Sequence, residues 1–212
     1  MKAIITCGGK GTRLLPFTKE LPKEMAPIFS LGKNDIEIKP LIQQIFENLF
    51  TIGIREFCFI SGKTKRSLQD HFYPDQQQDI SDSLSSFYDK IIHSQIAWIN
   101  QLIPKGFGDA VLASKPFVNN DVFLVQAGDV VISSQIHSSI NKLIELSKND
   151  DIEAAFLVQT VTDPERHGIV TTEKDESISL VTKVVEKPKD PETNIGIMPF
   201  YFFRSSIFDA LG

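Results

Sequence analysis

The sequence predicts an α/β fold: a Rossmann-like, mostly parallel sheet flanked by helices, in three α/β/α layers. Apolar segments of strand length alternate with amphipathic segments along the chain, a pattern typical of parallel sheets covered on both faces. The first apolar segment, residues 2–6, runs directly into glycine-rich sequence. A length of 212 residues with 42% hydrophobic residues suits a large core. We therefore expect residues 1–212 to form a single domain.

The individual elements follow from apolar runs and their period. In chain order, the predicted strands are residues 2–6, 56–61, 96–100, 122–126, 153–159, 168–171 and 180–186, and a further apolar run covers 197–203. A helix is predicted after Pro40, because apolar residues recur from Leu41 to Phe50 on one helix face, which should pack on the sheet. The segment 74–95 begins with a polar stretch, 74–86, which predicts a surface insertion of unassigned role.

Composition limits the kind of protein that this chain can be. With a net charge of −5 and a pI near 5.4, it lacks the basic character typical of nucleic-acid binding. No apolar run approaches the roughly twenty residues of a membrane span, and no secretory signal is evident. We expect a cytoplasmic protein that binds neither nucleic acid nor membrane, with Cys7 and Cys58 as reduced core residues. The sequence leaves the oligomeric state open and is compatible with a homo-oligomer.

The stretch 8–23, GGKGTRLLPFTKELPK, is the predicted phosphate site. Glycines let the backbone approach a polyphosphate closely and direct successive N–H groups at it. Basic side chains cluster here although the chain as a whole is acidic, which favours an anionic ligand. The glycines are Gly8, Gly9 and Gly11, and the cations are Lys10, Arg13, Lys19 and Lys23.

Two other glycine motifs fit this sequence less well. A Walker loop would need a glycine where Phe57 precedes the only GlyLysThr, residues 62–64. A dinucleotide fingerprint would need a third glycine where Leu14 stands, and no acidic residue follows at the expected distance. An ordinary flexible turn with incidental basic residues remains the alternative to a phosphate site.

The whole stretch resembles the signature of the sugar-nucleotide pyrophosphorylases, GGxGTRLxPxTxxxPKxMxPI. These nucleotidyltransferases join a nucleoside triphosphate to a sugar 1-phosphate and release pyrophosphate. The matching positions are Gly8, Gly9, Gly11, Thr12, Arg13, Leu14, Pro16, Thr18, Pro22, Lys23, Met25, Pro27 and Ile28. Within the family, the sequence PKEM at residues 22–25 is most similar to the branch that uses UTP and glucose 1-phosphate. The branch that uses dTTP is the second most similar. The resemblance continues, with gaps, to about residue 203.

The resemblance implies a base-recognition element within residues 98–111, WINQLIPKGFGDAV. Gln101 follows a predicted strand, and a glycine loop then opens a helix, where exposed backbone amides can meet a planar group. By resemblance, Gln101 contacts the edge of the base and Gly106 contacts it through its backbone. Without the signature, a helix-starting loop with a surface glutamine would be preferred.

A metal-binding carboxylate is predicted at Asp129. The strand 122–126 delivers AlaGlyAsp to its carboxyl end, where open α/β sheets place ligands. By resemblance, Asp129 is the first metal ligand of the family, and Mg²⁺ suits it because that ion accepts carboxylate and phosphate oxygens. The alternative is an aspartate that caps the following turn.

A sugar-phosphate site is implied farther along, where Glu186, Lys187 and a proline end a predicted hairpin. By resemblance, Glu186 accepts hydrogen bonds from sugar hydroxyls and Lys187 binds the sugar phosphate. Gly168 resembles the glycine that lets the sugar lie close, and Asn194 resembles an asparagine that contacts a hydroxyl. A solvated GluLys pair is the alternative.

The resemblance implies a reaction without a protein nucleophile. An oxygen of the sugar phosphate attacks the α-phosphorus of the triphosphate, and pyrophosphate leaves in line. Arg13 would bind the β- and γ-phosphates, and Lys23 would lie against the α-phosphate or the sugar phosphate. Asp129 would hold Mg²⁺ against the phosphates. Catalysis would then come from orientation and charge neutralisation.

Three departures from the family pattern leave alternatives open. His167 replaces a common tyrosine and Pro199 a common glycine, which puts the sugar in doubt. The segment that carries the second metal carboxylate in the family has no equivalent before Gly212. The chain is therefore expected to be truncated, to take that carboxylate from elsewhere, or to bind nucleotide sugars without turnover. A fourth alternative is transfer to a non-sugar phosphate such as phosphocholine.

Overall fold

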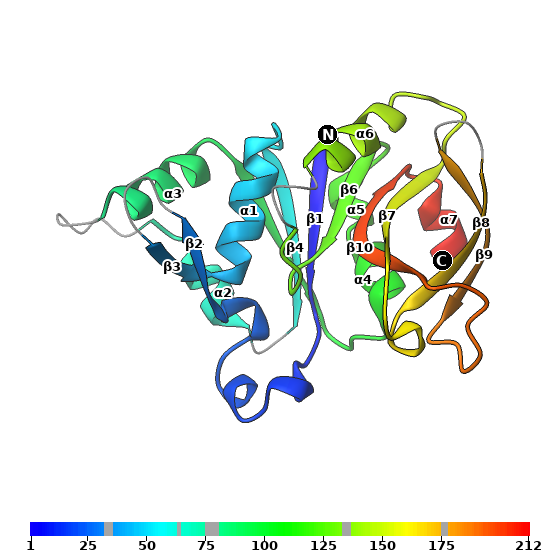
Figure 1. Ribbon diagram of the computed structural model, residues 1–212. Helices are drawn as coiled ribbons and strands as arrows, with labels where there is room; N and C mark the ends of the chain where they lie inside the picture. The colour runs from blue at the N-terminus through cyan, green and yellow to red at the C-terminus, as the bar shows by residue number, and fades with distance from the viewer. Residues whose placement is uncertain (32–35, 63–64, 75–80, 133–136, 175–177) are drawn as a thin grey trace.

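A computed structural model describes residues 1–31, 36–62, 65–74, 81–132, 137–174 and 178–212 (Figure 1). Its centre is a twisted sheet in the order β5-β4-β1-β6-β10-β8-β9, with β7 also paired to β10. The strands are β1 (Lys2–Cys7), β4 (Glu56–Gly62), β5 (Gln95–Gln101), β6 (Phe123–Ala127), β7 (Ala154–Thr160), β8 (Gly168–Lys174), β9 (Ser179–Glu186) and β10 (Ile195–Phe203). β2 (Pro27–Leu31) and β3 (Ile36–Pro40) form a separate antiparallel pair.

The sheet has a parallel part and an antiparallel extension. β5, β4, β1 and β6 run parallel, whereas β10 pairs antiparallel with β6, β7 and β8, and β8 with β9. The edge strand β5 is only partly buried, but β1, β4 and β6 are buried on both faces and therefore read as continuous apolar runs. This is why short apolar segments were sufficient to predict them.

Helices cover both faces of the parallel strands (Figure 1). Successive side chains of a strand point to opposite faces. On β1, Ile5 therefore packs into one core cluster and Ile4 into the other. The first cluster takes apolar residues from α1 (Leu41–Thr51), α2 (Arg66–His71), α3 (Asp82–Ile92) and α6 (His137–Leu146). The second takes them from α4 (Phe107–Ala113), α5 (Lys115–Val118) and α7 (Ile207–Leu211).

The α/β fold class, the helix after Pro40 and the predicted strands are confirmed, with most strand ends within one residue. The antiparallel pair β2 and β3 was not predicted, because prolines bound both strands and its apolar side chains face outward. Phe29 and Ile38, which lie opposite each other in it, are 76% and 66% exposed. Cys7 and Cys58 are free and buried, as predicted. Across the described residues, no helix is long and apolar enough to cross a membrane.

The polar stretch 74–86, predicted to be a surface insertion, contains the start of a helix that was not predicted there, and its described residues 81–86 are exposed or partly exposed. The helix α3 begins at Asp82, and the Ser81 hydroxyl accepts a hydrogen bond from the Leu84 N–H at 3.3 Å. Phe87 in this helix is fully buried and packs edge-on against Phe46. Apolar residues at helical spacing behind the polar stretch are the reason for this helix. Residues 75–80 of the predicted insertion lie outside the described residues.

Candidate active site

The carboxyl ends of the four parallel strands meet at one edge of the sheet. In the register, Thr6 of β1 lies opposite Ile60 of β4 and Ala127 of β6, and Gly62 lies opposite Gln101. The segments that follow β1, β4 and β5 line a cleft of about 300 Å³. Its lining includes Gly8, Gly9, Lys10, Thr18, Pro22, Lys65, Gln101 and Leu102. This is the edge at which open α/β sheets place ligands.

The predicted glycine loop packs closely against two other predicted site residues. A Cβ on Gly8 would lie 2.6 Å from Gln101 Oε1, and one on Gly9 would lie 2.6 Å from Lys23 Nζ. Gly11 has a φ of +67°, and its carbonyl accepts a hydrogen bond from the Thr18 hydroxyl at 2.7 Å. Side chains at these positions would displace Gln101, Lys23 or Thr18, so the loop is adapted to close approach.

Lys23 and Asp129 form an ion pair beside the glycine loop. Lys23 Nζ lies 2.5 Å from Asp129 Oδ2, although the two residues are 106 positions apart in sequence. Lys23 begins the short 3-10 helix η3 (Lys23–Met25), and Asp129 follows β6. Gly128 precedes it because a Cβ there would lie 2.7 Å from Cys7 Sγ and 3.1 Å from the Thr6 carbonyl oxygen. The backbone thus brings the carboxylate directly beside the glycine loop.

A second ion pair, between Glu24 and Lys65, lies beneath the loop and was not predicted. Lys65 Nζ donates to both carboxylate oxygens of Glu24 at 2.8 Å and to the Gly9 carbonyl at 2.9 Å. Glu24 is fully buried and Lys65 is 9% exposed. Burial raises the pKa of the Glu24 carboxyl, and the Lys65 charge opposes this rise. The one sequence signal for Lys65 was its place just after a predicted strand.

Gln101 and the loop behind it form the other wall of the cleft. Gln101 ends β5 and is 6% exposed. Its Nε2 donates to Asp109 Oδ2 at 2.5 Å, and the Lys105 N–H donates to the same oxygen at 3.3 Å. Gly106 precedes α4 with a φ of +132°, a conformation that side chains rarely adopt. Gln101 is therefore not the surface glutamine of the alternative hypothesis.

Thr12 and Arg13 lie in the short 3-10 helix η1 (Thr12–Leu14), directly after Gly11, and both are exposed. Within the described part of the chain, no hydrogen bond or ion pair holds the Arg13 guanidinium. The structure brings Lys23, Asp129, Gln101 and the glycines together, whereas no hydrogen bond or ion pair among the described residues ties the Arg13 side chain to them.

The predicted sugar-phosphate residues form a separate group on β8 and β9. Gly168 lies opposite Glu186, and a Cβ on Gly168 would lie 3.2 Å from Glu186 Oε2. Lys187 has a φ of +47°, donates its N–H to the His167 carbonyl at 2.9 Å, and places its Nζ 2.9 Å from Glu186 Oε1. Asn194 is exposed just before β10.

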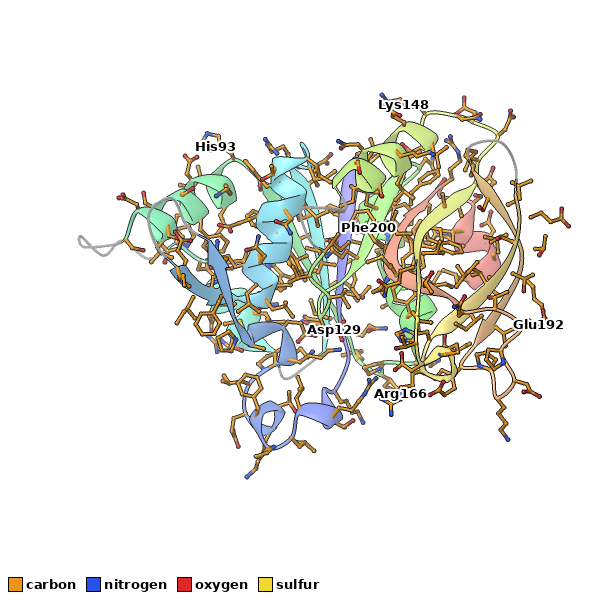
Figure 2. The ribbon with its side chains drawn as sticks, in the orientation of Figure 1. His93, Asp129, Lys148, Arg166, Glu192 and Phe200 are labelled. Atoms are coloured by element: carbon orange, nitrogen blue, oxygen red, sulfur yellow. The ribbon has the colours of Figure 1, made fainter. Side chains whose placement is uncertain are left out.

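The strand register places this second group at the same edge as the first. Because β10 runs antiparallel to β6, its beginning lies at the edge where β6 ends. Gly196 near that beginning pairs with Ile169 of β8, so Gly168 and Glu186 lie there too. In Figure 2, Asp129 and Arg166, which lies two residues before Gly168, are both labelled on the lower side of the molecule.

Tyr201 on β10 lies within reach of the Glu186 charge. Burial, with a smaller contribution from that charge, raises the pKa of Tyr201 to about 12.

The candidate metal site consists of one carboxylate. Among the residues that the structure describes, no group of three or more His, Cys, Asp or Glu is placed to hold a metal ion. Asp129 nevertheless suits a cation: its side chain is 38% exposed, and the Lys23 ammonium lies against Oδ2. Mg²⁺ is commonly bound through one or two carboxylates together with substrate phosphates. The donor set therefore fits a metal ion shared with a phosphate ligand.

The sheet, the glycine loop at its carboxyl edge and the pairing of Lys23 with Asp129 are the features of an α/β transferase that handles nucleotides. Residues 2–212 match the family model described as Nucleotidyl transferase, and the chain belongs to that family. The family resemblance of the signature is thereby confirmed. Members of this family generally use a divalent metal ion.

Within this family, the chain is similar to relatives named as UTP–glucose-1-phosphate uridylyltransferases. A UTP–glucose-1-phosphate uridylyltransferase of Staphylococcus epidermidis is 34% identical over 224 residues, covering 99% of this chain and 74% of the relative. A putative UTP–glucose-1-phosphate uridylyltransferase of Methanocaldococcus jannaschii is 30% identical, with 99% and 74% covered.

Solved structures agree with this fold. A UDP-glucose pyrophosphorylase complexed with UDP-glucose has a TM-score of 0.85 at 28% identity, covering 99% of this chain and 78% of that chain. A putative glucose-1-phosphate thymidylyltransferase from Bacillus anthracis, in complex with a sucrose, has a TM-score of 0.75 at 26% identity, covering 99% and 73%. The uridylyltransferase likeness is therefore the stronger of the two.

Proposed function

We propose that this chain transfers a uridylyl group from UTP to glucose 1-phosphate, forming UDP-glucose and pyrophosphate. The observation that carries the proposal is the meeting of Gly9, Lys23 and Asp129 at the carboxyl edge of the sheet. There an ammonium and a carboxylate lie beside a loop that has no side chains at Gly8 and Gly9. The relatives named for UTP and glucose 1-phosphate supply the substrates.

In this reaction an oxygen of glucose 1-phosphate forms a bond to the α-phosphorus of UTP, while the bond from that phosphorus to the bridging oxygen breaks. The leaving pyrophosphate takes the negative charge. Lys23 would bind the α-phosphate or the sugar phosphate and so neutralise charge between the two polyanions. Arg13, which is exposed and unpaired within the described residues, would bind the β- and γ-phosphates, with Thr12 and the glycine N–H groups beside it.

The remaining site residues would position the substrates. Gln101 and Gly106 would contact the base from the wall of the cleft. Glu186, Lys187 and two neighbours, Gly168 and Asn194, would hold the sugar phosphate at the same edge. A divalent ion, Mg²⁺ in this proposal, would be held by Asp129 and the substrate phosphates and would supply positive charge to the phosphate oxygens.

The test is magnesium-dependent pyrophosphate release from UTP, dTTP, CTP, ATP and GTP, each with glucose 1-phosphate. The proposal expects the highest kcat/KM with UTP. Higher kcat/KM with dTTP would instead support the thymidylyltransferase alternative. The protein could instead release no pyrophosphate with any triphosphate, although it melts cooperatively and UDP-glucose raises its melting temperature. That result would support a binding protein without turnover.

Replacing Glu186 with alanine should raise KM for glucose 1-phosphate by about tenfold or more, the effect of one lost charge-assisted hydrogen bond. KM for UTP should change little, because Glu186 lies on β9 and pairs with Gly168 of β8, on different strands from the one that leads into the glycine loop. Steady-state kinetics with each substrate varied in turn measures both values. Glu192→Ala is the matched control, since Glu192 pairs with Lys183 outside the proposed site.

Two outcomes would contradict the role of Glu186. Equal changes in both KM values would indicate a structural role rather than a sugar contact. Turnover of phosphocholine that equals turnover of glucose 1-phosphate, and that is unaffected by Glu186→Ala, would indicate a non-sugar acceptor.

A further inference from the structure

The side-chain amide of Gln101 has only one chemically acceptable orientation in this structure. One end of the amide lies 2.5 Å from Asp109 Oδ2. A carboxylate accepts hydrogen bonds and donates none, so the amide must present its NH₂ group to Asp109. The orientation of a glutamine amide is otherwise an assignment made from its partners. Here Asp109 determines it, and Oε1 is forced to the other side.

That other side is the cleft. Gln101 Oε1 lies 2.6 Å from the position of a Cβ on Gly8, and both residues line the cleft. The 6% exposure of Gln101 means that a ligand reaching its amide would be largely removed from water there. The wall of the cleft thus presents a hydrogen-bond acceptor at Gln101, while the donor of the same amide is occupied by Asp109.

Asp109 is itself held by the fold. It lies in the first turn of α4, and the Lys105 N–H donates to its Oδ2 at 3.3 Å. The next residues of the helix, Ala110 and Val111, are buried in the second core cluster. Rotation of the Gln101 amide would therefore cost the hydrogen bond to Asp109 and set two acceptors against each other.

We propose that Asp109 is a positioning residue that determines which pyrimidine the cleft accepts. By holding the amide of Gln101, it presents a fixed acceptor to a base with an N–H at ring position 3, as in uracil and thymine. Cytosine has an unprotonated nitrogen at that position, which would face the acceptor without a proton between them. The inference rests on the proposed function, in which Gln101 contacts the base.

The first variant to test is Asp109→Asn. An asparagine amide can accept from or donate to Gln101, so the glutamine amide is free to take either orientation. The ratio of kcat/KM for UTP to that for CTP should fall by about tenfold or more, the equivalent of one hydrogen bond. The matched control is Asp89→Asn, at an exposed position on α3 that pairs with His93.

A second variant restores the fixed acceptor by reversing the hydrogen bond. In the double variant Gln101→Glu with Asp109→Asn, the asparagine amide donates to the new carboxylate, whose other oxygen accepts whichever way it turns. The total charge of the pair is unchanged. The double variant should regain most of the preference for UTP over CTP that Asp109→Asn loses. A purely structural role of Asp109 does not predict this rescue.

Equal losses of kcat/KM with UTP and CTP in Asp109→Asn, so that the ratio is unchanged, would overturn the inference. So would a double variant no more selective than the single one. If the wild-type chain releases no pyrophosphate, the proposed function fails, and the same comparison is made with UDP and CDP as ligands in a melting assay. If UDP and CDP then raise the melting temperature equally, or if neither raises it, the inference is overturned independently of the proposed function.

Discussion

Replacing Lys23 with alanine should lower kcat for pyrophosphate release by about 100- to 1,000-fold. Removing one group that stabilises charge in the transition state typically has this effect. The Lys23 ammonium lies where the loop backbone at Gly9 and the Asp129 carboxylate meet, and its pairing with Asp129 fixes its position before substrate arrives. KM for UTP should rise less than kcat falls, because the charge acts most strongly on the transition state.

The control for Lys23→Ala is Lys148→Ala. Lys148 is exposed at the upper edge of the molecule, opposite Asp129 in Figure 2, so its removal should leave kcat unchanged. Steady-state pyrophosphate release measures both variants, and a melting curve confirms that each is folded. A fall in kcat of less than tenfold for Lys23→Ala would contradict a role for this ammonium at the reacting phosphate.

Replacing Lys65 with methionine should lower the free energy of unfolding at neutral pH by about 3–5 kcal/mol. Breaking a buried ion pair by removing one partner leaves the other charge buried and uncompensated. Here the remaining charge would be the fully buried Glu24, and the Gly9 carbonyl would lose its donor as well. Denaturant unfolding measures the loss. The phosphate loop should become less ordered, so UTP binding should weaken too.

The destabilisation of Lys65→Met should depend on pH with a definite sign. Burial already raises the pKa of Glu24 above its ordinary 4.5, and Lys65 opposes that rise. Without Lys65 the folded-state pKa rises further, so the folded protein binds a proton more tightly than the unfolded chain does. Stability from this group is then present below pH 4.5 and lost as pH rises through the folded pKa. The variant should therefore recover relative to wild type as pH falls toward 4.5.

A double variant separates the lost charge from lost packing. Glu24→Gln combined with Lys65→Met removes both charges, and neutral replacements of a buried pair are often close to neutral in stability. The double variant should be more stable at neutral pH than Lys65→Met alone. Equal stability of the two variants, or a loss for Lys65→Met that does not change with pH, would contradict the account given for this pair.

The central strands β1, β4 and β6 could be predicted because they are buried on both faces. A strand such as β4 has apolar side chains on both sides, including Phe59 and Ile60, and so stands out in the sequence. The pair β2 and β3 was missed because its outward face carries the apolar residues Phe29 and Ile38. Apolar side chains on the exposed face hide the alternation of apolar and polar residues that would indicate a strand. Helix α3 was missed because a polar stretch precedes its apolar face.

The candidate site could be predicted in part. Glycines, cations and Asp129 stand at the ends of recognisable strands, and the structure brings most of them together, while their roles stay predictions. Glu24 and Lys65 could not be paired from sequence, because they are 41 positions apart and meet only through the sheet. Asp109 carried no signal, since its effect depends on which atom of Gln101 it contacts.

The meeting of four strand ends at one edge of the sheet also has a kinetic consequence. β1 pairs with β4 on one side and β6 on the other, and both lie far along the chain. Contacts between distant segments form late, because closing long loops costs entropy before the contacts stabilise the fold. Lys23 cannot meet Asp129 until β6 has docked beside β1. During refolding, nucleotide binding should therefore recover later than the helical circular-dichroism signal. Only completely folded chains would bind the nucleotide.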